Sequence, residues 1–216
     1  MARIPQTAQV RNAAPGSSRR FLLIAGVLAG LVILGTGAFL ALALQDTPRG
    51  VAGTALAGAI GGPFQLVDQN GKTFTDADLK GKWSLVYFGY THCPDACPTA
   101  LNDISIALSE LGPKRDAVRP VFITVDPERD TPESLKAYVT SFDAPMLALT
   151  GTADQVAKAA KGYRVYYAKH PEAGGGYSMD HSSVIYVMDP EGRFTASFTH
   201  ESAPEQIAER LKKLIG

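Results

Sequence analysis

The sequence predicts an α/β domain built around a mixed β-sheet and preceded by a segment long enough to cross a membrane. Three observations lead to this. Residues 21–44 are apolar and carry no charge, and strand-like and helix-like segments alternate from residue 63 to the C-terminus. Both cysteines of the 216-residue chain, Cys93 and Cys97, stand where a buried strand gives way to a helical pattern. Alternating strands and helices are typical of a sheet covered by helices.

The charges of the chain balance in number, 21 basic and 21 acidic, but not in position. Residues 1–50 carry five arginines and a single acid, Asp46, whereas the remainder carries 16 basic and 20 acidic side chains. A basic tail followed by a mildly acidic body argues against nucleic-acid binding, which needs a basic surface on the folded domain.

Residues 21–44 are predicted to form a single transmembrane anchor, because a helix of this length spans the ~30 Å hydrocarbon core of a bilayer. Arg19 and Arg20 precede it, so the positive-inside rule places the N-terminus in the cytoplasm and the rest of the chain outside. A cleaved signal peptide is the alternative, with residues 41–43 as its cleavage signal, but the apolar region of such peptides spans only about 7 to 15 residues. No cysteine lies near the end of the segment, which excludes a lipoprotein anchor.

We therefore expect a basic cytoplasmic tail at residues 1–20, the anchor at 21–44, a flexible tether at 45–62 and a folded domain at 63–216. The tether is rich in glycine, alanine and threonine and has no hydrophobic period. The short N-terminus lacks a long Ser/Arg-rich transit segment, which favours a bacterial inner membrane with a periplasmic domain over a mitochondrial membrane.

The folded domain opens with a predicted β-hairpin at residues 64–75, because Asn70-Gly71 is typical of a two-residue type I′ turn. Residues 83–90 are nearly all apolar, aromatic or β-favouring, as in a strand buried on both faces. Residues 97–111 then carry apolar side chains at helical spacing, and residues 119–125 form the next buried strand.

Capping patterns mark the later helices. Asp130, with the proline and glutamate that follow it, opens a helix to residue 142, while Thr152 and Ser202 each begin a capping box. The cysteine motif at the first strand-to-helix junction makes a thioredoxin-like arrangement the natural candidate. The other predicted elements, in order, are a helical turn at 76–81, strands at 145–150 and 163–169, a helix at 152–161, a mobile loop at 170–180, strands at 182–188 and 194–199, and a final helix.

The chemistry centres on Cys93 and Cys97. Residues four apart on a helix lie on the same side, with Cβ atoms about 5–6 Å apart, which suits two thiolates on one metal ion and also permits a disulfide. The helix N-terminus and the neighbouring His92 lower the thiol pKa and favour the thiolate, the form that binds metal.

Several interpretations of the pair compete. A structural disulfide closing so short a loop would contribute only about 2 kcal/mol, which a domain of this size does not need. A thioredoxin-type redox pair has Cys-x-x-Cys rather than Cys-x-x-x-Cys, and a peroxidase needs one reactive cysteine. Structural zinc takes four ligands, whereas copper(I) is satisfied by two thiolates and one imidazole. Copper(I) is the favoured metal, and redox cycling of the pair stays open.

The third ligand would be one of four histidines. His181 stands out because it directly precedes the apolar strand at 184–188, whose entry loop faces the cysteine turn in a thioredoxin-like sheet. His170 lies in a polar, glycine-rich segment and His200 follows the last strand, so both are expected at the surface. His92 adjoins Cys93, and ligation by adjacent residues strains the chain.

Three further residues are candidates for a place near the site. Asp126 and Arg129 follow a buried strand at its carboxyl end, where ligand sites of α/β proteins form. They either make a turn with a helix cap or lie near the metal and steer a partner. Met179 is either an auxiliary soft ligand or an ordinary loop methionine.

Taken together, these residues resemble the Sco/SenC family of copper-binding assembly proteins. The resemblance spans residues 62–200, and the combination of its motifs is highly specific. The departures are small: Ala96 where the motif often has valine, and Met179 before Asp-His. His-Ser-Ser also replaces the thioredoxin-type cis-proline before Val184, which argues against a general disulfide oxidoreductase. The matching segments are Gly62-Pro-Phe, Asp78-Leu-Lys-Gly-Lys, Tyr87-Phe-Gly-Tyr-Thr-His-Cys-Pro-Asp-Ala-Cys-Pro, Phe122-Ile-Thr-Val-Asp-Pro-Glu-Arg-Asp-Thr-Pro and Asp180-His-Ser.

The resemblance implies a thioredoxin-like domain that binds copper(I), or copper(II), through Cys93, Cys97 and His181. It implies delivery of copper to the binuclear copper site of cytochrome c oxidase subunit II, or reduction of the cysteines of that site. Another copper chaperone or a thiol reductase would act as donor. A metallochaperone, rather than an enzyme, is the expected class.

Overall fold

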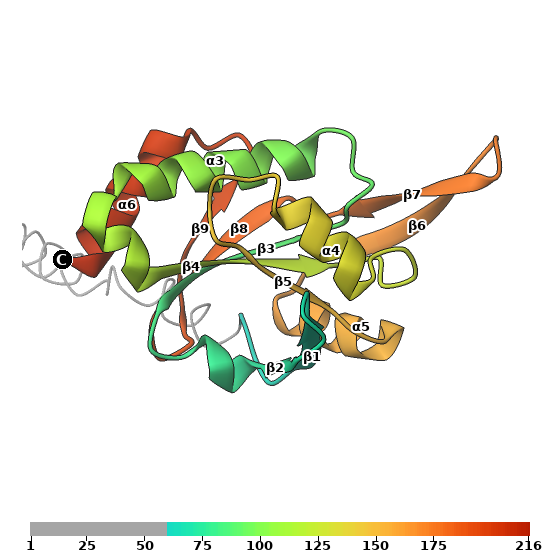
Figure 1. Ribbon diagram of the computed structural model, residues 1–216, viewed down its shortest axis with the longest axis horizontal. Helices are drawn as coiled ribbons and strands as arrows, with labels where there is room; N and C mark the ends of the chain where they lie inside the picture. Colours follow the sequence, from blue (N-terminus) through green and yellow to red (C-terminus); the bar gives the residue numbers. More distant parts are fainter. Residues whose placement is uncertain (1–59) are drawn as a thin grey trace, which may run out of the picture. The chain divides into compact units, whose positions relative to one another are not determined.

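The computed structural model describes residues 60–216. Its centre is a seven-stranded mixed sheet in the order β2-β1-β5-β4-β3-β8-β9 (Figure 1). The three middle strands, β5 (Leu147–Thr150), β4 (Val118–Thr124) and β3 (Trp83–Gly89), run parallel to one another. Their carboxyl ends therefore meet at one edge of the sheet, where the functional residues gather. The predicted α/β class and its mixed sheet are confirmed.

The outer strands pair antiparallel, and helices cover both faces of the sheet. α3 and α6 lie together on one face and α5 on the other (Figure 1). The central strands β3 and β4 are buried almost throughout, as the apolar runs predicted. The remaining elements are β1 (Gln65–Asp68), β2 (Thr73–Thr75), η1 (Asp76–Leu79), α3 (Ala96–Glu110), η2 (Gly112–Ala117), α4 (Pro132–Val139), α5 (Ala153–Gly162), β8 (Val184–Met188), β9 (Phe194–Thr199) and α6 (Pro204–Ile215).

The prediction of a loop at residues 170–180 is wrong. β6 (Tyr167–Glu172) and β7 (Gly176–His181) form a separate antiparallel hairpin that extends away from the main sheet (Figure 1). The predicted strand at 163–169 correspondingly begins only at Tyr167. Much of this hairpin is exposed, so it carries no apolar alternation by which sequence could identify it, and Pro171 and the glycine run suggested a loop.

The N-terminal hairpin is present, with Leu66 paired to Phe74, but its turn is not type I′. That turn needs positive φ at both central residues. Gly71 has φ of 82°, whereas Asn70 is not in the positive region. The Asp68 carboxylate accepts the backbone N–H groups of Asn70 and Lys72, at 2.8 and 2.9 Å, and this stabilises a wider turn.

Two predicted helix caps also differ. The N-cap of α4 is Thr131, whose hydroxyl accepts the Ser134 N–H at 3.2 Å, because the Asp130 carboxylate bonds elsewhere. Ser202 accepts the Thr199 N–H rather than capping α6, whose N-cap is Ala203. The capping box that begins α5 at Thr152 is confirmed.

The predicted cytoplasmic tail (1–20), anchor (21–44) and nearly all of the tether (45–62) lie outside the described residues. Within residues 60–216, no helix is both long enough and apolar enough to span a bilayer.

α5 ends in a Schellman motif with an unusual residue at its turn. The Val165 N–H donates to Ala160 O at 2.9 Å and the Arg164 N–H to Lys161 O at 3.1 Å. The motif requires a left-handed conformation at Arg164, whose φ is 56°, and glycine normally occupies this position.

Arg164→Gly is expected to raise the free energy of unfolding by about 1 kcal/mol, because the exposed Arg164 is held in a conformation that disfavours side chains with a Cβ. Lys158→Gly, at an exposed position inside the same helix, is the control and should lower it by a similar amount. Urea unfolding measures both. If Arg164→Gly instead lowers the free energy of unfolding, the left-handed conformation of Arg164 is not strained.

Candidate metal centre

The two cysteines lie beyond the carboxyl end of β3, where the chain turns into α3. Cys97 is in the first turn of the helix and fully buried, whereas Cys93 lies in the preceding turn and is partly exposed. The Cys97 N–H donates to Cys93 Sγ at 3.4 Å, and both thiols are free. The first turn of the helix thus directs an N–H group at the more accessible sulfur.

His181 approaches the same point from β7. Its Nε2 lies 3.3 Å from Cys97 Sγ, and its Nδ1 lies 3.3 Å from Ser182 O. Tyr87 and Tyr90 pack edge-on against the imidazole, with ring centroids 6.0 and 5.9 Å away. The sulfurs of Cys93 and Cys97 and one imidazole nitrogen lie within 4.8 Å of one another, so the three side chains could hold one metal ion.

A glycine in β3 makes room for the buried sulfur. A Cβ on Gly89 would lie 2.6 Å from Cys97 Sγ and 2.9 Å from a ring carbon of Phe122. Both distances are shorter than atoms can approach without displacement. Gly89 therefore allows α3 to bring Cys97 directly against the sheet.

The two thiols share one proton unequally. The pKa of Cys93 is lowered to about 3, chiefly because its sulfur accepts a hydrogen bond from Cys97, with further help from His181 and backbone N–H groups. The pKa of Cys97 is raised, because it donates that bond and because it is buried. The metal-free pair is thus a Cys93 thiolate beside a Cys97 thiol.

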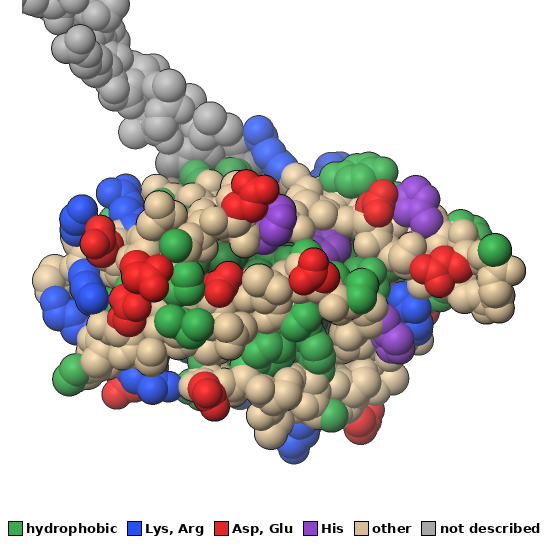
Figure 2. All heavy atoms as spheres, turned by 90° about the horizontal axis from the view of Figure 1, so that it is seen from above, with side chains coloured by type: hydrophobic (Ala, Val, Ile, Leu, Met, Phe, Trp, Pro, Cys, Tyr) green, Lys and Arg blue, Asp and Glu red, His purple; other side chains and the backbone are tan. Residues whose placement is uncertain are grey.

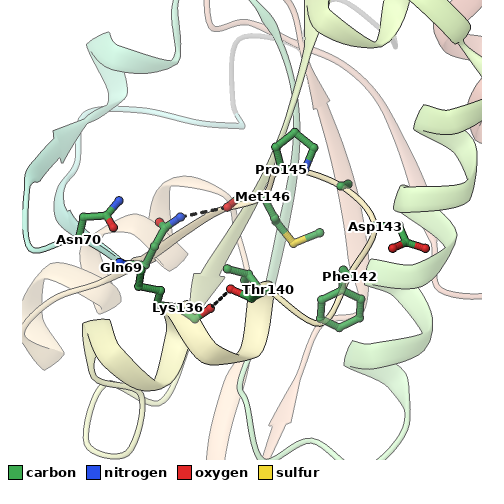
Figure 3. Close-up of a pocket in the computed structure, with 10 residues that line it drawn as sticks. Gln69, Asn70, Lys136, Thr140, Phe142, Asp143, Pro145 and Met146 are labelled. Atoms are coloured by element: carbon green, nitrogen blue, oxygen red, sulfur yellow. Dashed lines mark hydrogen bonds between the residues drawn. The ribbon is translucent and has the colours of Figure 1, made fainter.

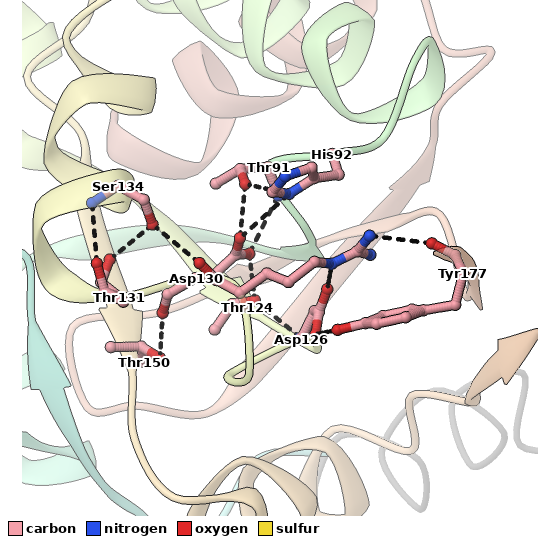
Figure 4. Close-up of polar contacts among 10 residues, drawn as sticks. Thr91, His92, Thr124, Asp126, Asp130, Thr131, Ser134, Thr150 and Tyr177 are labelled. Carbon is pink, nitrogen blue, oxygen red and sulfur yellow. Dashed lines mark hydrogen bonds and ion pairs between the residues drawn. The ribbon is translucent and has the colours of Figure 1, made fainter. Parts of the chain in front are cut away.

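A buried carboxylate anchors the cysteine turn to the sheet (Figure 4). Asp130 is fully buried and accepts the Thr91 N–H at 3.0 Å and the Thr91 hydroxyl at 2.6 Å. It also accepts the Thr124 hydroxyl at 2.6 Å, while its own carbonyl accepts the Thr150 hydroxyl at 2.8 Å. The turn before Cys93 is thereby tied to the ends of β4 and β5.

The other three histidines lie outside the cluster. His92 is exposed, with Nδ1 at 3.0 Å from the Thr91 hydroxyl. His170 and Asp180 form an exposed ion pair at 2.9 Å on the hairpin, and His200 is exposed after β9. These placements agree with the surface positions expected for His170 and His200.

Asp126 and Arg129 do more than make a turn. The Arg129 Nε donates to the Asp126 carboxylate, and its Nη1 donates to Tyr177 O at 2.9 Å. The guanidinium carbon lies 3.7 Å from the centre of the Tyr177 ring. Tyr177 is a residue that the sequence did not identify, because it lies in the segment predicted to be a loop. Met179, also in that segment, is a buried residue of β7.

A hollow of about 400 Å³ lies elsewhere, between the N-terminal hairpin turn and α4 (Figure 3). No cysteine or histidine lines it. Gln69 donates to Met146 O at 3.1 Å and accepts the Ala148 N–H at 2.9 Å, so its side chain extends the hydrogen bonding of β5. The hollow has no part in the chemistry of the cysteines.

Known proteins resemble this chain in sequence and in fold. The model of the SCO1/SenC family matches residues 52–216. Protein SCO2 of Saccharomyces cerevisiae, a mitochondrial protein, is 42% identical over 164 residues, covering 73% of this chain and 54% of that protein. The chain thus spans about half the length of this relative.

Solved structures of Sco proteins are also similar to this chain. Bradyrhizobium japonicum ScoI with copper bound is 52% identical, with a TM-score of 0.67 over 72% of this chain and 99% of that one. BsSco, a member of the Sco family of cytochrome c oxidase assembly proteins in which a disulfide switch was identified, is 26% identical. Its TM-score is 0.58 over 73% of this chain and 94% of that one. These similarities confirm the predicted thioredoxin-like fold, and the chain belongs to the SCO1/SenC family.

Proposed function

We propose that this protein is a membrane-anchored copper chaperone that binds one copper ion through Cys93, Cys97 and His181. The convergence of these three side chains within 4.8 Å carries the proposal. Two thiolates and one imidazole suit copper(I), which is soft and accepts three ligands. Structural zinc takes four, and no fourth cysteine, histidine or carboxylate joins the group among residues 60–216.

The protonation of the three groups suits this role. Nδ1 of His181 faces Ser182 O, so donation of the Nδ1 proton there would leave the Nε2 lone pair free for a metal when one binds. The Cys93 sulfur is already a thiolate, whereas Cys97 must lose its proton when copper binds. Uptake of one copper(I) ion therefore releases about one proton from the cysteine pair.

The acceptor we propose is the binuclear copper site of cytochrome c oxidase subunit II, reached by ligand exchange while that oxidase is assembled. The copper in B. japonicum ScoI and the assembly role of the family of BsSco support this. Figure 2 shows a face on which apolar side chains and histidines reach the surface, with acidic side chains among them. Such a face suits contact with another protein. The donor would be another copper chaperone or a thiol reductase.

We also propose that the predicted anchor holds the protein in a bacterial inner membrane, with the N-terminus in the cytoplasm and the thioredoxin-like domain in the periplasm. The support is the uncharged run at 21–44 and the arginines that precede it. The folded domain would then meet the periplasmic part of its partner.

Thiol–disulfide reduction of the same partner is the second candidate, favoured by the low pKa and partial exposure of Cys93. The Cys93 thiolate would attack a partner disulfide, forming a mixed disulfide and releasing one partner thiolate. Cys97 would then lose its proton and attack Cys93 Sγ. This closes the Cys93–Cys97 disulfide and releases the second partner thiol, so the partner gains the two electrons that this chain loses.

His181→Ala is expected to lower copper(I) affinity by more than about a hundredfold, beyond the loss caused by removing an outer-sphere contact. An anaerobic titration against a competing chelator measures this. His92→Ala is the matched control, because His92 adjoins Cys93 but lies outside the cluster. Equal affinity in wild type and His181→Ala would remove His181 from the site and favour thiol exchange. A defect in oxidase assembly that appears in the cysteine variants but not in His181→Ala would also favour thiol exchange.

Alkylation of Cys93 in the metal-free protein is expected to stay fast from pH 8 down to pH 5, since its pKa of about 3 keeps the thiolate populated. An ordinary thiol is ionised to roughly one part in a thousand or less at pH 5. Mass spectrometry after timed iodoacetamide treatment measures the rate.

Two substitutions of Cys97 test the cause of that low pKa. Cys97→Ala removes the donor and should slow alkylation of Cys93 at pH 5, whereas Cys97→Ser keeps an O–H donor and should largely preserve it. Identical pH profiles for both variants would show that the hydrogen bond does not set the pKa.

Gly89→Ala is expected to lower the free energy of unfolding by about 1–3 kcal/mol and to weaken copper binding, because the added Cβ displaces Cys97 Sγ. Gly174→Ala, where a Cβ meets nothing within 4 Å, is the control and should leave both unchanged. Wild-type copper affinity in Gly89→Ala would show that the close approach is unnecessary.

A further inference from the structure

Of the three proposed ligands, His181 is the one whose position is least secured by its own element. It ends β7, and within residues 60–216 β7 pairs only with β6, in a two-stranded hairpin that is separate from the seven-stranded sheet. Two-stranded hairpins are marginally stable on their own in water. Contacts between the hairpin and the rest of the domain must therefore hold the imidazole near the cysteines.

One face of β7 makes these contacts. Side chains two residues apart along a strand share a face, so Tyr177, Met179 and His181 point the same way. Met179 is 8% exposed and, with Val125 and Asp126, lines a small hollow next to the turn after β4. His181 reaches Cys97. Tyr177 is the outermost of the three and lies against Arg129.

The contact between Tyr177 and Arg129 is built from several interactions that converge. The Tyr177 hydroxyl donates to Asp126 Oδ1 at 2.8 Å, and the backbone carbonyl of Tyr177 accepts from Arg129 Nη1 at 2.9 Å (Figure 4). The guanidinium stacks on its ring, and Lys169 Nζ lies 3.8 Å from the same ring centre. Asp126 is 3% exposed and also pairs with Arg129, so both charges are compensated within the contact.

A second route joins Arg129 to His181. The guanidinium carbon lies 5.7 Å from the centre of the Tyr90 ring, and the same ring packs edge-on against the His181 imidazole. Tyr90 is 4% exposed, so it has little room to move. Arg129 thus supports His181 both through the β7 backbone and through a buried aromatic ring.

We propose that Asp126, Arg129 and Tyr177 form a latch that positions His181 for metal binding. The latch rests on the proposed function, because it acts through a ligand assigned there. The three are positioning residues and do not touch the metal. Releasing the latch frees the hairpin, so the imidazole leaves the position in which its Nε2 meets the two sulfurs.

A double-mutant cycle on the full chain tests this, with anaerobic copper(I) titration as the readout. Tyr177→Leu removes the ring stacking and the hydroxyl. It is expected to weaken copper(I) binding by about tenfold when His181 is present, within the range seen for residues that orient ligands. In His181→Ala, the same substitution should have no effect, because the latch acts only through His181.

Two controls accompany the cycle. Tyr177→Phe keeps the ring on Arg129 and loses only the bond to Asp126, so it should recover part of the affinity that Tyr177→Leu loses. General damage to folding would instead lower the affinity equally with and without His181. His170→Ala removes an exposed ion pair of the same hairpin that touches neither Arg129 nor the cysteines, and should leave affinity unchanged.

Each outcome decides between the proposals. An equal loss for Tyr177→Leu with and without His181, or no loss in either, overturns the latch. If His181→Ala weakens binding and Tyr177→Leu does not, the latch alone fails and the proposed function stands. If His181→Ala itself binds as well as wild type, the ligand assignment fails first, and the latch with it.

Discussion

The buried carboxylate of Asp130 is the interaction on which the site depends. The carboxylate joins the turn before Cys93 to the end of β4 by accepting from Thr91 and Thr124. The backbone carbonyl of Asp130 adds the end of β5 by accepting from Thr150. A fully buried carboxylate is stable only when its oxygens are hydrogen-bonded, and three donors within 3.0 Å provide this. Removal of any one donor leaves a charge short of a partner, so the turn, both strands and the start of α4 are coupled.

The three proposed ligands are held with unequal rigidity. Cys97 is fixed by α3 and by the close approach that Gly89 allows, and Cys93 lies in a turn tied down by Asp130. His181 depends on a hairpin outside the main sheet and on the contacts of Tyr177. A transfer protein must give up its ion by replacing ligands one at a time. The ligand on the least supported element is the one that can leave with the least disturbance of the fold.

The sequence predicted the central strands and α3 correctly because their apolar patterns have clear periods. It also predicted Cys93, Cys97 and His181 as ligands, and the structure brings these three side chains together. The residues alone only favoured His181 among four histidines, and the family resemblance made it the expected ligand. The β6–β7 hairpin was missed because it is exposed and needs no apolar alternation. Asp130 was read as a helix cap, since sequence does not show that a carboxylate turns inward to bind Thr91. The contact of Tyr177 with Arg129 joins residues 48 apart, and no local pattern encodes it.

Copper binding and disulfide formation compete for the same atoms, so the two candidate functions are linked rather than independent. In the metal-free protein the Cys97 N–H donates to Cys93 Sγ at 3.4 Å, and the two sulfurs lie within 4.8 Å of one another and of a nitrogen of His181. Disulfide formation removes two electrons from the pair and joins the sulfurs about 2.05 Å apart, so neither sulfur remains a thiolate and His181 is left without thiolate co-ligands. Copper(I) bound to both sulfurs would therefore protect the reduced pair, and oxidation would expel the ion. Because copper and an oxidised partner would both consume the Cys93 thiolate, whichever reached it first would determine which of the two proposed reactions follows.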